Sequence, residues 1–183
     1  TTFWTSVDNV MKGLSAVYNP FRRMTSGYYG GLEGIMHLQM RGDDLYPTRG
    51  EEPYIWEYLS FVNTTNTKDL SWGNIYEGIQ MANEFIYRAA TVDMDETKRE
   101  QMIGEAYFLR GFWYFRLRTD YRDAVIRTLP QDADPETHGL SSGDEVLEQA
   151  ISDFKEAKSR LPKLRSSDEN GRVTQGAAIA MLG

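Results

Sequence analysis

The chain has 183 residues, of which 40% are hydrophobic and 13% aromatic, a composition typical of a globular protein with one sizeable core. Its net charge of −7 argues against binding to nucleic acids and anionic membrane surfaces, which attract proteins through lysine and arginine. The absence of cysteine excludes disulfides, thiolate nucleophiles and thiolate metal sites. No run of about eighteen apolar residues is present, so the sequence predicts no membrane-spanning helix.

The first predicted helix extends from about Ser6 to Tyr18, with Ser6 suited to cap its start and Pro20 to end it. A glycine-rich stretch at 26–34 then precedes a short helix at about 35–40. Apolar residues three and four positions apart indicate that the first helix buries one stripe. The residues expected on that stripe are Val7, Val10, Met11, Leu14 and Val17.

Helical periodicity is lost between Arg41 and Asn66, a loop that combines aromatic and polar side chains. Aromatic rings can stack on the apolar faces of sugars, and a few placed polar groups can bind hydroxyls. Tyr54, Trp56 and Tyr58 alternate, so they share one face if this segment is extended. The candidate glycan-binding residues are Trp56, Tyr54, Tyr58, Tyr46, Arg41, Asp43, Asp44, Arg49 and Asn63.

An alternative interpretation of this loop is purely structural. Long loops need internal packing, so the same aromatic side chains could hold the segment against the helices. Asp43 and Asp44 are adjacent acids, but a calcium site needs six to eight oxygen ligands that the sequence does not supply, so we expect solvated or capping carboxylates there. His37 and His138 stand without the partners that zinc sites require, and we expect no metal and no cofactor.

Two further helices follow the loop. One carries an apolar stripe from Trp72 to Ala89, and the other extends from about Asp95 to about Arg118 and is apolar around most of its circumference. A helix of the second kind has to be covered on more than one side, which predicts a central position in a helical stack. We expect Arg110, at its middle, to pair with an acid of a neighbouring helix or to bind carbonyls, and Asn83 to bind backbone.

A polar connection leads to Ser142, which forms a predicted capping box with Glu145 at the start of the next helix. That helix buries an apolar stripe and stops at Pro162, and a turn is expected at 170–171. Thr174 is suited to cap a last helix with a close-packing face. Because this face has only begun at Gly183, we expect the chain to be a fragment of a longer protein.

Paired antiparallel helices predict an all-α, tetratricopeptide-like helical repeat array with long irregular loops, forming a single region over 1–183. Five segments in the same order also resemble motifs of the SusD/RagB-like family of outer-membrane lipoproteins from Bacteroidetes. They are the F-W helix at 3–18, the W-x-x-x-Y-x-x-I-x-x-A-N helix at 72–83, the E-x-x-F-L-R-A-x-x-Y-F helix at 105–115, the E-V…A…L-P helix at 145–162 and the G-R-x-T-K-G-A-A element at 171–178. One departure is Tyr121-Arg122-Asp123, where the family has Tyr-Gly-Asp, so the turn geometry can differ.

This resemblance implies a lipid-anchored protein on the cell-surface face of the outer membrane, with the anchor and the C-terminal part missing from this chain. It implies that the protein captures oligosaccharide, delivers it to a SusC-like TonB-dependent transporter, and touches the membrane only through the anchor. The alternative is a helical-repeat scaffold that binds protein and no carbohydrate. We expect no enzyme, because the chain lacks a phosphate-binding loop, a nucleophile elbow and a zinc-protease motif.

Overall fold

The computed structural model describes residues 3–21 and 72–183, and the structural statements below concern these residues. The chain divides into two units, one of Thr1–Tyr18 with Tyr76–Gly183 and the other of Asn19–Ile75. Of the second unit, the described residues are the 3-10 turn Asn19–Phe21 and the first turn of one helix. The described part contains helices, connections and one isolated bridge between Ala124 and Ser141, which confirms the all-α prediction.

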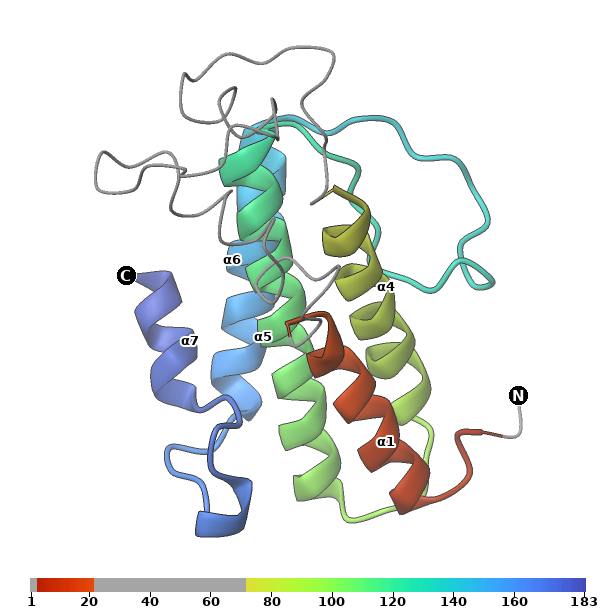
Figure 1. The fold of residues 1–183 in the computed structure, drawn as a ribbon, viewed down its shortest axis with the longest axis vertical. Coiled ribbons are helices and arrows are strands. Elements are labelled where there is room, and N and C mark those ends of the chain that lie inside the picture. The colour runs from red at the N-terminus through yellow and green to blue at the C-terminus, as the bar shows by residue number, and fades with distance from the viewer. Residues whose placement is uncertain (1–2, 22–71) are drawn as a thin grey trace, which may run out of the picture. The chain divides into compact units, whose positions relative to one another are not determined.

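The described helices are α1, α4, α5, α6 and α7 (Figure 1). Their bounds are Val7–Tyr18, Trp72–Ala89, Glu96–Asp120, Gly143–Arg160 and Gln175–Leu182, with a short 3-10 helix at Ser167–Glu169. From α4 to α7 each helix runs opposite to the one before it, which is the arrangement expected of a tetratricopeptide-like array. None of these described helices combines the length and apolar character that a membrane crossing needs.

The helix starts agree with the capping signals in the sequence. Asp95 accepts a hydrogen bond from the Lys98 amide at 2.8 Å and begins α5. Ser142 and Glu145 form the predicted capping box at the start of α6, with the Glu145 carboxylate 2.7 Å from the Ser142 amide nitrogen. Thr174 precedes α7 in the cap position, but its side chain makes no capping hydrogen bond. At α7 the sequence therefore predicted the position of the cap residue correctly, but the expected capping hydrogen bond is not formed.

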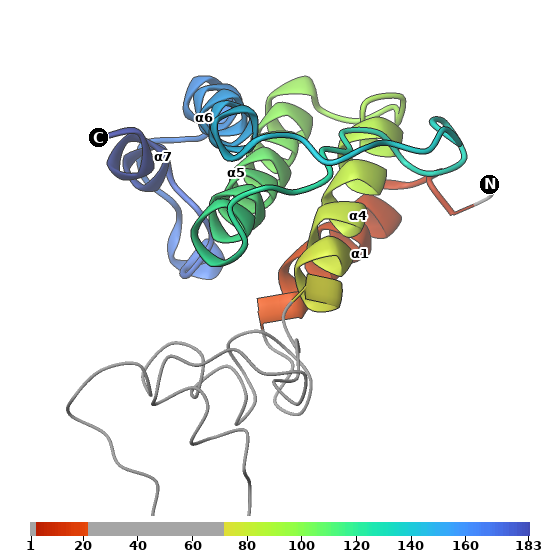
Figure 2. The same ribbon diagram turned by 90° about the horizontal axis from the view of Figure 1, so that it is seen from above.

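Helix α5 lies between α6 on one side and α1 with α4 on the other, which confirms its predicted central position (Figure 2). Small residues allow its neighbours to approach closely. A Cβ atom added at Gly111 would lie 3.0 Å from the Cβ of Asp153 on α6. One added at Gly78 of α4 would lie 2.2 Å from Nε1 of the fully buried Trp113. Larger side chains at these two glycines would force the helices apart.

The predicted stripe of α1 is partly wrong. Val10, Leu14 and Val17 are buried, but Val7 and Met11 are 44% and 42% exposed. The buried face is narrower than the sequence suggested because Gly13 lies on it, close to Trp4 and Phe85. Because Gly13 has no side chain, α1 can approach α4 closely at this residue. Val7 and Met11, which lie to the side of the contact, remain in solvent.

Candidate functional site

All of the predicted glycan-binding residues lie outside the described residues, so their arrangement stays a prediction. They are Trp56, Tyr54, Tyr58, Tyr46, Arg41, Asp43, Asp44, Arg49 and Asn63. The described part shows instead how helix side chains hold two connections in place. One connection joins α5 to α6, and the other joins α6 to α7.

A buried polar cluster centred on Arg110 joins three helices. Its guanidinium donates two hydrogen bonds to Asp153 of α6, at 2.8 and 2.7 Å, and a third to the side-chain oxygen of Asn83 on α4, at 2.8 Å. Burial raises the pKa of the Asp153 carboxyl, while its hydrogen bonds to Arg110 and Gln149 oppose that rise. The prediction that Arg110 pairs with an acid of a neighbouring helix is confirmed, and the buried charge is compensated.

The same cluster fixes the α5–α6 connection, residues 121–142, by binding its backbone. Arg110 donates to the carbonyl of Thr128 at 3.0 Å, and Asn83 donates to the carbonyls of Arg127 and Leu129 at 3.0 and 3.3 Å. The hydroxyl groups of two tyrosines each receive an amide hydrogen bond from the connection and donate back to a carbonyl of the same residue. These tyrosines are Tyr114, paired with Arg127, and Tyr76, paired with Val125. Buried backbone groups that have no strand partner are satisfied in this way.

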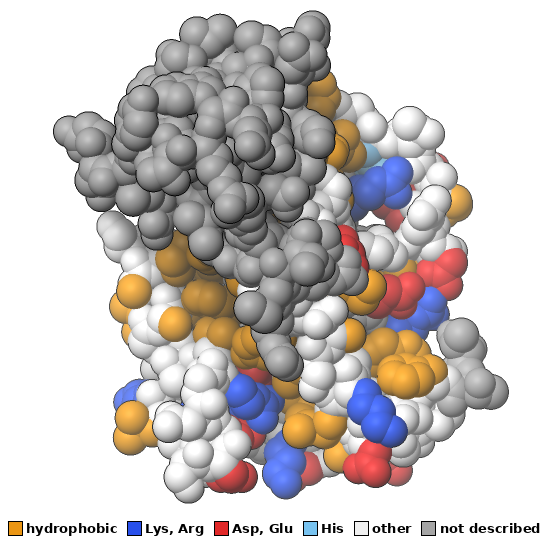
Figure 3. All heavy atoms as spheres, in the orientation of Figure 1, with side chains coloured by type: hydrophobic (Ala, Val, Ile, Leu, Met, Phe, Trp, Pro, Cys, Tyr) orange, Lys and Arg blue, Asp and Glu red, His pale blue; other side chains and the backbone are white. Residues whose placement is uncertain are grey.

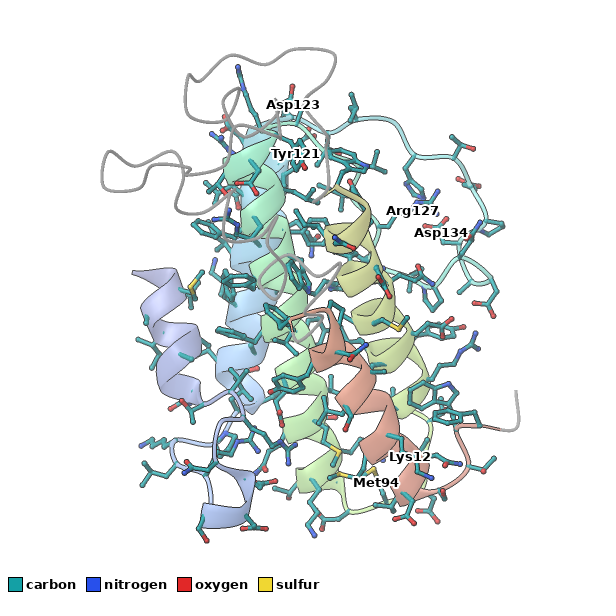
Figure 4. The ribbon with its side chains drawn as sticks, in the orientation of Figure 1. Lys12, Met94, Tyr121, Asp123, Arg127 and Asp134 are labelled. Atoms are coloured by element: carbon teal, nitrogen blue, oxygen red, sulfur yellow. The ribbon has the colours of Figure 1, made fainter. Side chains whose placement is uncertain are left out.

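Further contacts within the α5–α6 connection shape its polar part (Figure 4). Arg127 donates to the carbonyls of Asp134 and Glu136, at 3.5 and 2.9 Å. His138 lies 2.7 Å from the carboxylate of Asp134, four residues earlier, so the prediction that this histidine lacks a carboxylate partner is wrong. Where the connection begins and ends, Asp123 accepts a hydrogen bond at 2.8 Å from the amide of Gly143, the first residue of α6.

The turn after α5 carries a strained residue. Arg122 has a φ of +71°, in the left-handed region that glycine adopts without cost. The sequence motif has glycine at this position, and the arginine adopts a conformation that suits that glycine. The departure from the motif therefore places an arginine in a backbone conformation that favours glycine.

A second buried cluster surrounds Glu105, a fully buried carboxylate of α5. Arg165 and Arg172, both from the α6–α7 connection at 161–174, donate to it at 2.8 and 3.0 Å, and Tyr18 of α1 donates at 2.6 Å. Both arginines also pair with Glu169. Sequence reasoning missed this cluster, although a glutamate within the otherwise apolar stretch 102–109 signals a need for buried partners.

Among the described residues no three histidine, aspartate or glutamate side chains gather closely enough to hold a metal ion. The buried carboxylates, Glu105 and Asp153, are each held by arginine. Acidic and basic side chains also alternate along the lower part of the face in Figure 3, without a broad patch of one sign.

The helices and their tethered connections form a tetratricopeptide-like array, a fold that is found in SusD-like proteins. The model of the family described as SusD-like, starch-binding and associating with the outer membrane matches residues 38–183, and the chain belongs to this family. Two curated proteins of Formosa agariphila, SusD-like proteins P38 and P2, are each 26% identical to it, over 170 and 159 residues. The matches cover 90% and 84% of this chain and 32% and 31% of those proteins, so the chain spans about a third of their length.

Solved structures agree with this assignment. A laminarin-binding SusD-like protein superposes with a TM-score of 0.84 at 27% identity, covering 97% of this chain and 39% of the other. A SusD superfamily protein from Bacteroides vulgatus gives a TM-score of 0.84 at 26% identity, covering 98% and 39%. Surface glycan-binding protein A from Bacteroides fluxus, at 20% identity and a TM-score of 0.80 over 97% and 39%, shares the fold.

Proposed function

We propose that the protein containing this chain captures oligosaccharide at the outer-membrane surface and passes it to a SusC-like TonB-dependent transporter. The observation that carries the proposal is the family match over residues 38–183. The similarity to a laminarin-binding structure supports a carbohydrate as the ligand. The proposal includes a lipid anchor and a longer protein of which this chain supplies a helical region, since its relatives are about three times as long.

The proposed mechanism is binding without a covalent step, because the family is described by what it binds and not by a reaction. Aromatic rings of the loop at 41–66 would stack on sugar faces, and its polar side chains would bind hydroxyls. We propose Trp56 as the main stacking residue, flanked by Tyr54 and Tyr58. The described helices would serve as the rigid support, with their connections fixed by Arg110 and Glu105.

Calorimetric titration of the complete protein with laminari- and malto-oligosaccharides tests this proposal. We expect saturable binding to at least one series, and a loss of about tenfold or more in affinity on Trp56→Ala, which corresponds to about 1.4 kcal/mol. Leu164→Ala is the control, because Leu164 is 86% exposed and outside the proposed site. Binding unchanged by Trp56→Ala would exclude this loop as the site, and no binding to any sugar would favour a protein-binding scaffold. Co-purification with a TonB-dependent transporter from outer membranes tests the partner.

A further inference from the structure

A hollow near the start of the chain combines aromatic and charged side chains. Its volume is about 420 Å³, within the range of small-molecule sites. We call it the Trp4 groove: Phe3 and Trp4 line it from the N-terminal segment, Lys12 from α1, Glu84 and Arg88 from α4, and Asp132 from the α5–α6 connection. Lys12 is labelled on α1 in Figure 4. All of these residues belong to one unit of the chain.

The aromatic side of the Trp4 groove is built and held in place. The rings of Phe3 and Trp4 meet edge to face at 5.2 Å, and Trp4 packs on Phe85 at 5.9 Å. Gly13 makes room for the indole, because a Cβ there would lie 2.5 Å from a ring carbon. The side chain of Asn9 donates to the carbonyl of Phe3 at 2.7 Å and fastens the segment. Phe3 nevertheless remains 43% exposed, so part of this residue is accessible to a ligand.

The polar side of the Trp4 groove is fixed by ion pairs. Arg88 donates to Glu84 at 3.1 Å and also pairs with Asp132, so its guanidinium bridges α4 and the α5–α6 connection. The hydrogen bond from Arg88 lowers the pKa of the Asp132 carboxyl. With Lys12, the lining has two cations and two anions, whose formal charges cancel. The charged side chains of this lining include both donors and acceptors, which can bind the hydroxyl groups of a neutral ligand.

Two other hollows on the described part lack this combination. One, between the start of α5 and the end of α6, is lined by polar side chains that include Glu100 and Arg160, which pair with each other at 2.9 Å. Another, along α6 and α7, has Ile151 and Leu182 beside Lys155 and Lys158. Neither has an aromatic side chain among its described lining, so neither offers a surface on which a sugar ring can stack.

We propose that the Trp4 groove binds a neutral sugar unit, as a second carbohydrate contact that is independent of the loop at 41–66. The ring of Phe3 would stack on the sugar, and the side chains of Glu84, Arg88 and Asp132 would bind its hydroxyls. The class of ligand rests on the proposed function, whereas the groove rests on described residues alone. A long oligosaccharide bound at one site would have a high effective concentration at the other. Two weak contacts would therefore hold it longer than either contact alone.

Fluorine NMR of the complete protein containing 5-fluorotryptophan tests the two sites separately. This chain contributes four tryptophans, whose signals can be assigned by substitution. Trp4 reports on the groove and Trp56 on the loop, while Trp113, which is fully buried, serves as an internal control. We expect laminaritriose or maltotriose to shift the Trp4 signal saturably, both in the unmodified protein and in Trp56→Ala.

Two substitutions and their matched controls identify the groove as the source of the shift. Phe3→Ala should weaken the binding seen at Trp4 about tenfold, and Ala16→Lys, at an exposed groove-lining position, should abolish it. Val7→Ala and Met11→Lys change exposed residues outside the lining and should leave it unchanged.

A Trp4 signal that does not respond while Trp56 responds would overturn the groove proposal and leave the proposed function intact. A shift at Trp4 that survives Ala16→Lys would also overturn it, because the sugar would then be binding elsewhere. A response of neither tryptophan would count against both sites.

Discussion

The two connections that follow α5 are held in opposite ways. In the α5–α6 connection the loop supplies mainly backbone groups, which bind side chains of α4 and α5 such as Asn83 and Arg110, and Asp132 adds one side-chain ion pair to α4. In the α6–α7 connection the loop supplies its own side chains, Arg165 and Arg172, and the helix supplies a carboxylate, Glu105. The connections are 22 and 14 residues long, so both need such anchors to stay ordered.

This difference shows which residues determine the conformation of each connection. Any residue has a carbonyl, so the side chains of the α5–α6 connection can change without loss of its tether to Arg110. The α6–α7 connection depends on two specific arginines of its own. Substitutions should therefore act mainly through the helices in the first case and through the connection itself in the second.

The largest expected effect comes from removing the cation that serves the first connection. Arg110→Met leaves Asp153 buried without its ion-pair partner and the Thr128 carbonyl without its donor. We expect the free energy of unfolding, measured by urea denaturation, to fall by about 3–5 kcal/mol. Arg116→Met, which removes an i,i+4 pair with Asp120 near the surface of the same helix, should cost less than about 1 kcal/mol. Equal losses of unfolding free energy in the two variants would show that Arg110 stabilises the protein no more than a surface ion pair does.

A direct comparison of the two loops comes next in size. Arg172→Met removes donors to the buried carboxylate of Glu105 and should cost about 2 kcal/mol of unfolding free energy. Thr128→Ala changes an exposed side chain but keeps the carbonyl that Arg110 binds, so it should change stability by less than about 0.5 kcal/mol. A large loss for Thr128→Ala would contradict a contact in which Arg110 binds only the backbone of Thr128.

The pH dependence of the Glu105 cluster provides a third test. Burial and then Glu105 raise the pKa of the Tyr18 phenol above its ordinary value of 10.0. Its contribution is therefore fully present below about pH 10 and is lost as pH rises further, when the unfolded chain ionises first. Tyr18→Phe should cost about 1 kcal/mol near pH 8, and this difference should shrink near pH 11. A difference that does not change with pH would show that Tyr18 acts through packing only.

The smallest expected effect is a gain at the start of the α5–α6 connection. Arg122→Gly relieves the left-handed backbone conformation of Arg122, whose side chain is mostly in solvent. We expect the unfolding free energy to rise by about 0.5–1 kcal/mol, because the strain removed exceeds the entropy that glycine adds to the unfolded chain. Arg122→Ala is the control and should give no gain. A decrease for Arg122→Gly would mean that the arginine side chain contributes more than the strain costs.

Local signals were enough to predict the described helices and the approximate positions of their starts, whereas the helix expected at 35–40 lies outside the described residues. The capping box at Ser142 and the turn at 170–171 depend on neighbouring residues, and both are present, with Gly171 at a φ of +91°. The apolar circumference of α5 predicted that it is covered on several sides. The expected burial of Arg110 was also enough to predict that it pairs with an acid. It was not enough to predict that this acid is Asp153.

Contacts between distant residues could not be predicted from periodicity. Asp153 lies 43 residues from Arg110, and Arg172 lies 67 residues from Glu105, so only the packing of the helices shows which charges meet. The exposure of Val7 and Met11 likewise depends on how closely α1 approaches α4 at Gly13. Of the candidate sites, the glycan loop was proposed from composition, whereas the Trp4 groove required the positions of three separate segments.

The paired hydrogen bonds of Tyr76 and Tyr114 have a consequence for hydrogen–deuterium exchange. The amides of Val125 and Arg127 lie in a connection without strands, yet each donates at 2.8 Å to a tyrosine hydroxyl from a helix. Exchange at these two amides requires the connection to separate from α4 and α5. Their deuterium uptake should therefore follow the opening of the helical core, with rates closer to those of helix interiors than to those of surface loops.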